Sequence, residues 1–182
     1  MYKSIPERCA ARVLSGGPIV TVSSQSSDGV ADIMTAAWNC PFDSNIVQVT
    51  LDLGHTTSEN IKNTGKFVLG IPSKDQVEEI MKAGSVHGRD VGDKFDKLSI
   101  PYEFSEKLGL KVLRDQLAYI ECELFDFDIF AKSGICLGKA VSLYVQDKEW
   151  NDSEECFLDG AKHTLHHVKD NIFLCGHSII EG

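Results

Sequence analysis

Apolar and polar residues alternate along several short segments of the chain. In residues 45–53, Val47, Val49 and Leu51 alternate with polar residues, and this period of two is typical of a strand with one buried face. A polar, glycine-containing turn follows the first such segment and separates it from the second. The pattern predicts six strands, at residues 18–24, 30–38, 45–53, 66–71, 119–131 and 135–145.

The two longest segments differ in their regularity. In residues 119–131 the polar positions change parity near Leu124 and Phe125, and a change of this kind predicts a β-bulge. In residues 135–145 the apolar positions keep one parity from end to end. That second pattern predicts a strand whose apolar side chains all lie on the same face.

Short helices are expected between some of the strands. Residues 58–64 are expected to form a helix with Thr57 as its N-cap and Gly65 as the left-handed residue that ends it. Ser73 and Gln76 form a capping box, and the apolar residues that follow recur at helical spacing. Residues 85–95 show no clear periodicity, so we expect a charged, glycine-rich loop there.

The order of these elements bears on the fold class. Most strands are separated by turns or short helices, without the regular crossover helices of a parallel sheet. This arrangement favours a mainly β protein with an antiparallel barrel over a doubly wound sheet. The chain has no internal repeat, linker or low-complexity tract, and we therefore expect one domain over residues 1–182.

Composition and charge narrow the function classes. The 182 residues include 18 basic and 27 acidic side chains, and a net charge of −9 argues against non-specific binding to nucleic acid or an anionic membrane. We expect a cytoplasmic protein, because the sequence contains neither a signal-peptide core nor a membrane-spanning apolar run. Six scattered cysteines form no Cys-x-x-Cys pair, and Cys122 and Cys136 are expected to be buried thiols.

Common catalytic and nucleotide-binding motifs are missing from the sequence. It contains no Gly-x-Gly-x-x-Gly, Gly-x-x-x-x-Gly-Lys-Ser/Thr, His-Glu-x-x-His or Gly-x-Ser-x-Gly pattern. His163, His166 and His167 would share one face if their segment were helical. Solvated or core histidines are the favoured interpretation of this cluster over a metal site.

The first block with candidate binding chemistry is residues 28–41. Thr35, Ala36 and Ala37 are unusually small for a barrel strand, and the bulky Trp38 follows them. A flat ring would fit against such a backbone with Trp38 as its wall. Small residues at a tight barrel corner are the alternative.

Two further blocks offer sites for an anion. Thr57 at a helix N-terminus, with unpaired backbone N–H groups behind it, suits a phosphate, although an ordinary helix cap is the simpler interpretation. In residues 87–95, Arg89 and Lys94 are placed to close over a phosphate. A surface loop with internal ion pairs to Asp90 and Asp93 is the alternative.

Together the three blocks resemble the flavin reductase-like family, its flavoredoxin branch in particular. The resemblance is carried by residues 28–38, 57–69 and 88–95, and by Gly138 in the last long strand. It implies a six-stranded antiparallel split β-barrel of the Greek-key type, with FMN as cofactor. It also implies a homodimer with the flavin sites near the subunit interface.

The resemblance further implies roles for individual residues. Met34 to Trp38 would line the isoalloxazine ring, Thr57 would bind the phosphate, and Lys94 would face the ribityl-phosphate with support from Arg89 and Asp90. Cys40 would lie at the edge of the ring and fill space. The expected cofactor-binding residues are Met34, Thr35, Ala36, Ala37, Trp38, Thr57, Asn60, Arg89, Asp90 and Lys94.

Two departures from the family pattern leave the function open. Ser133 stands where many relatives carry a histidine, and His55 replaces another common basic residue. His166 or His167 is a hypothetical substitute for the lost imidazole. One expectation is an FMN-dependent oxidoreductase that passes electrons from NADH or NADPH to a flavin, a metal complex or a protein. The other is a flavoredoxin-type electron carrier, whose FMN is reduced by a redox partner protein.

Overall fold

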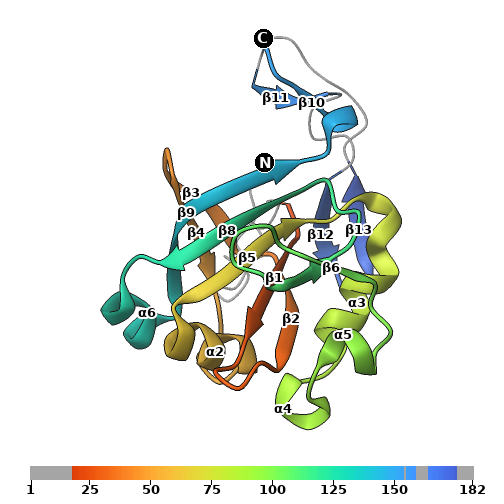
Figure 1. Cartoon of the computed structure of the whole chain (residues 1–182). Coiled ribbons are helices and arrows are strands. Elements are labelled where there is room, and N and C mark those ends of the chain that lie inside the picture. Colours follow the sequence, from red (N-terminus) through yellow and green to blue (C-terminus); the bar gives the residue numbers. More distant parts are fainter. Residues whose placement is uncertain (1–17, 154, 159–163, 176–182) are drawn as a thin grey trace, which may run out of the picture.

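The structure is a computed structural model and describes residues 18–153, 155–158 and 164–175 (Figure 1). Within these residues, seven strands form one curled antiparallel sheet in the order β2–β1–β5–β8–β9–β4–β3. The mainly β, antiparallel barrel architecture predicted from the sequence is confirmed. The strands are Val20–Gln25 (β1), Ala31–Ala36 (β2), Asn39–Asp43 (β3), Ile46–Thr50 (β4), Lys66–Ile71 (β5), Ala118–Leu124 (β8) and Ile135–Val145 (β9).

Smaller elements surround this sheet. Three two-stranded sheets pair Tyr102–Phe104 (β6) with Lys111–Leu113 (β7), Trp150–Asn151 (β10) with Cys156–Phe157 (β11), and Leu165–Lys169 (β12) with Ile172–Cys175 (β13). The α-helices are Thr56–Thr64 (α2), Val77–Ser85 (α3), Gly88–Val91 (α4), Lys94–Lys97 (α5) and Phe127–Ser133 (α6). Two 3₁₀ turns are Lys74–Gln76 (η2), which carries the predicted Ser73–Gln76 capping box, and Asp147–Glu149 (η3).

The main sheet has one strand more than the six expected from the sequence. Among the described residues, the additional strand, β3, pairs with β4 alone and forms one edge of the sheet. Four of its five residues are exposed, so neither face selects apolar side chains. Without a buried face the strand has no alternating pattern, and this is why the sequence did not predict it.

The predicted strand at residues 119–131 was too long. Strand β8 ends at Leu124, and α6 begins at Phe127 after the side chain of Asp126 accepts a hydrogen bond from the N–H of Ile129 (2.9 Å). Gly134, with φ +75°, ends the helix. The change of parity near Leu124 and Phe125 therefore marks the end of a strand, and the bulge predicted there is wrong.

Strand β9 has the predicted bounds, but its side chains do not keep one face. Glu121 pairs with Ser142 and Cys122 with Ala140, so that Val141 is an extra residue on β9. Such a bulge changes which face each later side chain takes. Leu137, before the bulge, is buried, whereas Leu143, which has the same parity but follows the bulge, is 57% exposed.

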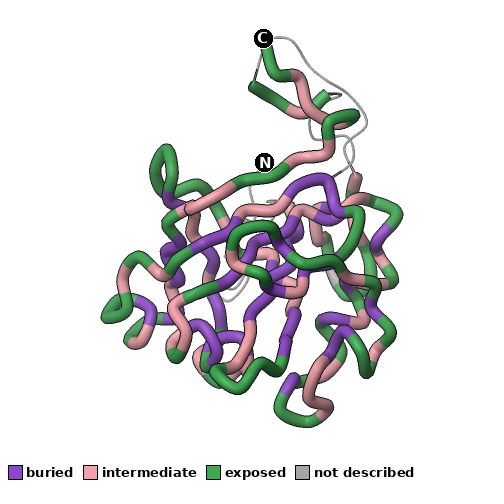
Figure 2. Tube along the Cα trace, in the orientation of Figure 1, coloured by how far each residue is buried: buried purple, intermediate pink, exposed green. Residues whose placement is uncertain are grey.

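The main core lies inside the curl of the sheet (Figure 2). Phe67, Cys122 and Cys136 are fully buried in it, which confirms the prediction for the two thiols. Burial raises the pKa of Cys136 to about 12. Gly138 is needed here because a Cβ at that position would clash with the ring of Phe67.

A second layer of helices covers one end of the sheet. Helices α3 and α5 pack against β2, and the hydroxyl of Thr35 donates a hydrogen bond to the carbonyl of Ile80 in α3 (2.6 Å). Phe95 of α5 is buried beside Ile33 and Leu113. In the part of the chain that the structure describes, no helix is long and apolar enough to cross a membrane.

Candidate functional site

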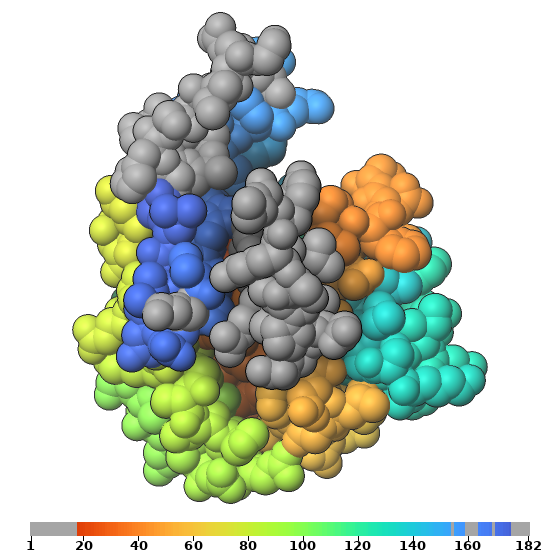
Figure 3. All heavy atoms as spheres, turned by 180° about the vertical axis from the view of Figure 1, so that it is seen from behind, coloured from red at the N-terminus to blue at the C-terminus, as the bar shows by residue number. Residues whose placement is uncertain are grey.

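The three sequence blocks meet at one cleft. Its volume is about 140 Å³, and it lies between β2, the beginning of α2, and the segment from the end of α3 to α5. In the view from behind, α2 and α4 lie side by side along the lower edge of the molecule (Figure 3). The cleft is lined by Asp32, Met34, Thr35, His55, Thr56, Thr57, Ala83, Gly84, Ser85, Val86, His87, Gly88 and Lys94.

A buried ion pair forms the floor of this cleft. The carboxylate of Asp32 accepts a hydrogen bond from the hydroxyl of Thr57, and its Oδ1 atom lies 3.2 Å from the ammonium nitrogen of Lys94. Lys94 also donates to the carbonyls of Ile33 (2.9 Å) and Ala83 (3.1 Å). Because Asp32 and Lys94 are both buried, this pairing is what makes their charges tolerable inside the protein.

The loop expected at residues 85–95 is wrong. This segment contains the end of α3, all of α4 and the beginning of α5. The side chain of Asp93 caps α5 by accepting hydrogen bonds from the N–H groups of Phe95 and Asp96. Its other carboxylate oxygen pairs with Lys111 (2.9 Å), and Lys94 is directed inward rather than held on a flexible loop.

Thr57 is not the N-cap of α2. The helix begins two residues earlier than predicted, at Thr56, with His55 in the N-cap position and without a side-chain capping bond. Thr57 lies in the first turn, where its hydroxyl bonds to Asp32. Asn60, another expected contact, is buried and donates to the hydroxyl of Ser24 (3.1 Å), so its amide ties α2 to β1. The predicted left-handed Gly65 is confirmed, with φ +69°.

Arg89 links the two sides of the cleft mouth. Its backbone N–H donates to the hydroxyl of Thr56 (3.0 Å), and its guanidinium donates to the carbonyl of Gly54. Gly88 allows this approach, because a Cβ there would clash with Asp32. Arg89 and the neighbouring Asp90 are both exposed, and neither lines the cleft itself.

Two histidines at the cleft were not among the expected binding residues. The ring centroids of His55 and His87 lie 5.4 Å apart, with 52° between the ring planes. His87 is the N-cap residue of α4, as His55 is of α2. Their positions in the sequence could have identified them, since each histidine stands next to a segment already predicted as an anion site.

The segment expected to bind the flavin ring lies only partly in the cleft. Met34 and Thr35 line it, whereas Ala36 and Ala37 pack against two core clusters. Trp38 then follows the end of β2 and is 58% exposed. Cys40, expected at the edge of the ring, is exposed on β3.

The remaining candidates lie in other elements. His166 and His167 belong to strand β12, so the condition under which they would share a helical face is not met, and His163 lies outside the described residues. The Nε2 atom of His166 lies 3.2 Å from the hydroxyl of Thr164. Ser133, at the end of α6, donates to the carbonyl of Ile129 (2.7 Å) and accepts from the N–H of Ile135 (3.1 Å).

Comparisons with known proteins agree on one family. The family described as flavin reductase like domain matches residues 12–166. The uncharacterized protein YddH of Escherichia coli (strain K12) is 31% identical over 170 residues, which cover 91% of this chain and 89% of that protein.

Two solved structures show the same fold. The FMN-binding domain of a flavin reductases-like enzyme from Shewanella baltica OS155 has a TM-score of 0.82 at 22% identity, covering 99% of this chain and 96% of that one. The flavoredoxin of Desulfovibrio vulgaris (Miyazaki F) has a TM-score of 0.81 at 19% identity, covering 100% and 97%.

Proposed function

Because the chain belongs to the flavin reductase-like domain family, we propose that it is an FMN-binding oxidoreductase whose cleft holds the FMN phosphate. The isoalloxazine ring would then extend along β2 from Met34 towards Trp38. The observation that carries the proposal is the meeting of three separate sequence blocks at one cleft.

The size and polarity of the cleft support a site for the phosphate end of FMN, with the ring outside the cleft. A pocket for a whole ligand of this size usually measures about 300–1,000 Å³. The cleft is smaller, at about 140 Å³, and suits one end of such a molecule. The first-turn N–H groups of α2, beginning at Thr56, lack partners within the helix and favour an anion. Thr57 and Lys94 would hold the floor in place, and Arg89 would close the mouth.

The exposed edge of the sheet supports a homodimer. Trp38 and Phe42 are each 58% exposed, in and beside edge strand β3. Large aromatic side chains at an unpaired sheet edge usually mark an interaction surface. We propose that a second copy of the chain covers this edge and completes the wall beside the flavin ring.

Bound FMN would supply the redox chemistry, since flavins accept hydride and transfer electrons. The chain would bind and orient the cofactor and control access to it. The proposed reaction carries electrons from NADH, NADPH or a redox partner protein to a flavin, a metal complex or a protein acceptor.

One local observation favours a second candidate, an electron carrier without direct NAD(P)H oxidation. The hydroxyl of Ser133 is engaged within the end of α6, at the position where the family resemblance implies a histidine.

Two measurements separate these possibilities. FMN is added to the purified protein and its fluorescence is titrated, with lumichrome as a ring-only control that lacks the phosphate chain. The FMN-loaded protein is then mixed anaerobically with NADH or NADPH in a stopped-flow instrument. Rapid bleaching supports the oxidoreductase, and a flavin that only a reduced carrier protein bleaches supports the electron carrier. A chain that fails to bind FMN would contradict both.

A further inference from the structure

We propose that His55 and His87 form a proton-linked clamp for the FMN phosphate, so that binding takes up protons and weakens as the pH rises above neutrality. This inference rests on the proposed function, and it concerns how the same cleft is regulated. Nothing in the comparisons assigns either histidine. It follows from the placement of the two rings and from the charges around them.

The two imidazoles are close enough to share one phosphate. Their ring centroids are 5.4 Å apart, and both residues line the cleft. Each occupies the N-cap position of its helix without a side-chain capping bond. Neither ring therefore accepts a hydrogen bond from the first-turn N–H groups of its helix. A protonated imidazole donates from both nitrogens, which suits a phosphate with several acceptor oxygens.

The permanent cation in the cleft, the ammonium of Lys94, already donates two hydrogen bonds and pairs with a carboxylate. A lysine ammonium has three N–H donors. In Lys94, three oxygen atoms surround the nitrogen, from Asp32, Ile33 and Ala83. Asp32 also neutralises its charge. Among the described lining residues, His55 and His87 are the other titratable groups, so the positive charge available at this surface depends on their protonation.

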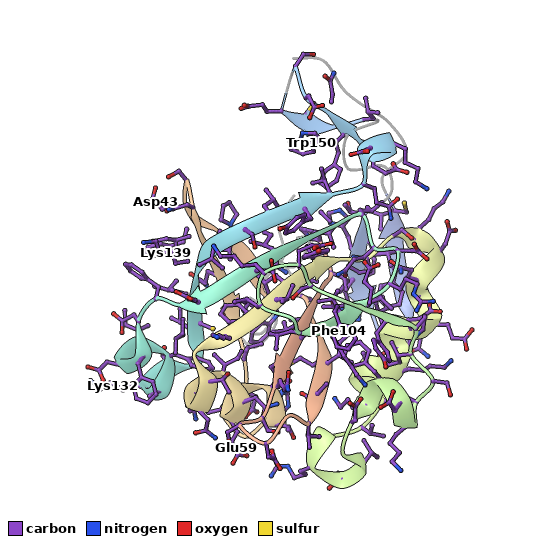
Figure 4. The ribbon with its side chains drawn as sticks, viewed as in Figure 1. Asp43, Glu59, Phe104, Lys132, Lys139 and Trp150 are labelled. Atoms are coloured by element: carbon purple, nitrogen blue, oxygen red, sulfur yellow. The ribbon has the colours of Figure 1, made fainter. Side chains whose placement is uncertain are left out.

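The groups outside the cleft do not remove this dependence. On the α2 side lie the exposed Asp52 and Glu59, the latter labelled in Figure 4. On the α4 side lie the exposed Arg89 and Asp90. Exposed charges of this kind are screened by salt over a Debye length of about 8 Å at physiological ionic strength. Of these groups, Arg89 is held next to His55 by its hydrogen bond to the carbonyl of Gly54, and its charge does not change with pH.

Linkage sets the direction of the effect. Two neighbouring imidazolium ions repel each other, and a phosphate dianion between the two rings offsets that repulsion. The dianion therefore favours the charged form of the rings in the complex. The extra affinity is greatest where the rings are charged and is lost as the pH rises. The phosphate takes up its own proton near pH 6, which limits the useful range to about pH 6.5–8.

Calorimetry on the unmodified protein tests the proposal directly. FMN and riboflavin, which lacks the phosphate, are titrated at about pH 7.5 in two buffers with different ionisation enthalpies. We expect FMN binding to take up on the order of one proton and riboflavin binding to take up none. If FMN binds but takes up no more protons than riboflavin does, the clamp is overturned.

Variants assign the protons to the two histidines. FMN affinity is measured at about pH 8 and 6.5 for the unmodified protein, His55→Gln, His87→Gln and the double variant. The affinity of the unmodified protein is divided by that of each variant at the same pH, because this ratio cancels the titration of the phosphate itself. We expect the ratio for each single variant to rise about five- to tenfold on acidification. Lys148→Gln, which removes an exposed cation in η3, is the control and should leave the ratio unchanged.

The outcomes distinguish the two proposals. A constant ratio with normal FMN binding overturns the clamp and leaves the proposed function standing. Absence of FMN binding at every pH overturns the proposed function and the clamp together. If a variant fails to fold, the proton count of the unmodified protein still decides the question.

Discussion

Asp32 joins the parts of the cleft at the scale of single residues. Its carboxylate contacts Thr57 in α2 and Lys94 in α5, and Gly88 in α4 packs closely against it. Four elements, which come from three separate stretches of the sequence, therefore meet at one side chain. The sequence did predict Thr57 and Lys94 as important. It did not identify Asp32, because an acidic residue inside a strand reveals its partner only in three dimensions.

Removing the partner of Asp32 should destabilise the fold. Lys94→Met leaves a buried carboxylate without its cation, and we expect the free energy of unfolding to fall by about 3–5 kcal/mol. The matched control is Lys82→Met, which breaks an exposed pair with Glu78 and should cost less than about 1 kcal/mol. Urea denaturation measures both. Equal losses would show that the Asp32–Lys94 pair is not a structural centre.

The two glycines beside the cleft should respond to alanine in opposite ways. A Cβ at Gly88 would clash with Asp32, and Gly88→Ala should cost about 1–3 kcal/mol. A Cβ at Gly84, in α3, would meet only Thr35 at an ordinary 3.9 Å. Because alanine favours helix, Gly84→Ala should stabilise the protein by up to about 1 kcal/mol. Thermal denaturation of both variants checks the signs, and a stabilising Gly88→Ala would contradict the close packing.

At the scale of elements, Glu121 ties β8 to its surroundings. Its buried carboxylate accepts hydrogen bonds from the N–H groups of Lys107 and Leu108 and from the hydroxyl of Ser142 on β9. Burial alone would raise the pKa of this group, but these bonds outweigh burial and the pKa of Glu121 is lowered. One side chain thus fastens the connection between β6 and β7 to the main sheet.

The lowered pKa predicts a loss of stability in acid. The contribution of Glu121 is fully present above the unfolded-state pKa of about 4.3 and is lost as the pH falls through the lower folded value. We expect the stability gap between the unmodified protein and Glu121→Gln to shrink between about pH 6 and 3. Urea denaturation across this range measures the gap. A gap that stays constant with pH would contradict this role for the carboxylate.

Elements with a buried face could be predicted, and short or exposed ones could not. The bounds of β5 and β9 follow from the sequence because each strand contains a run of residues buried in the core. Helices α4 and α5 have four residues each, which is too few for helical periodicity to appear. Their signals were local instead, in Asp93 as a cap and Phe95 as a buried anchor. Strand β3 lacked even these.

At the scale of the whole molecule, the proposed homodimer would form through the edge of the sheet at β3. If a second copy covers Phe42, then Phe42→Glu places a charge in that interface and should convert a homodimer into a monomer. Phe104→Glu, at an exposed position in β6, is the control and should leave the dimer intact. Sedimentation velocity distinguishes the two states. An unmodified protein that sediments as a monomer would rule out this interface.

The two buried thiols offer a way to time the motions of the sheet. Cys122 and Cys136 lie on the adjacent strands β8 and β9, and burial raises the pKa of both well above the usual range of a thiol. Since alkylating reagents attack the thiolate, these cysteines stay unreactive while the strands remain closed. The exposed Cys40 and Cys156 react first. Slow modification of Cys122 and Cys136 themselves therefore reports how often the sheet opens, in the native protein and without an attached label.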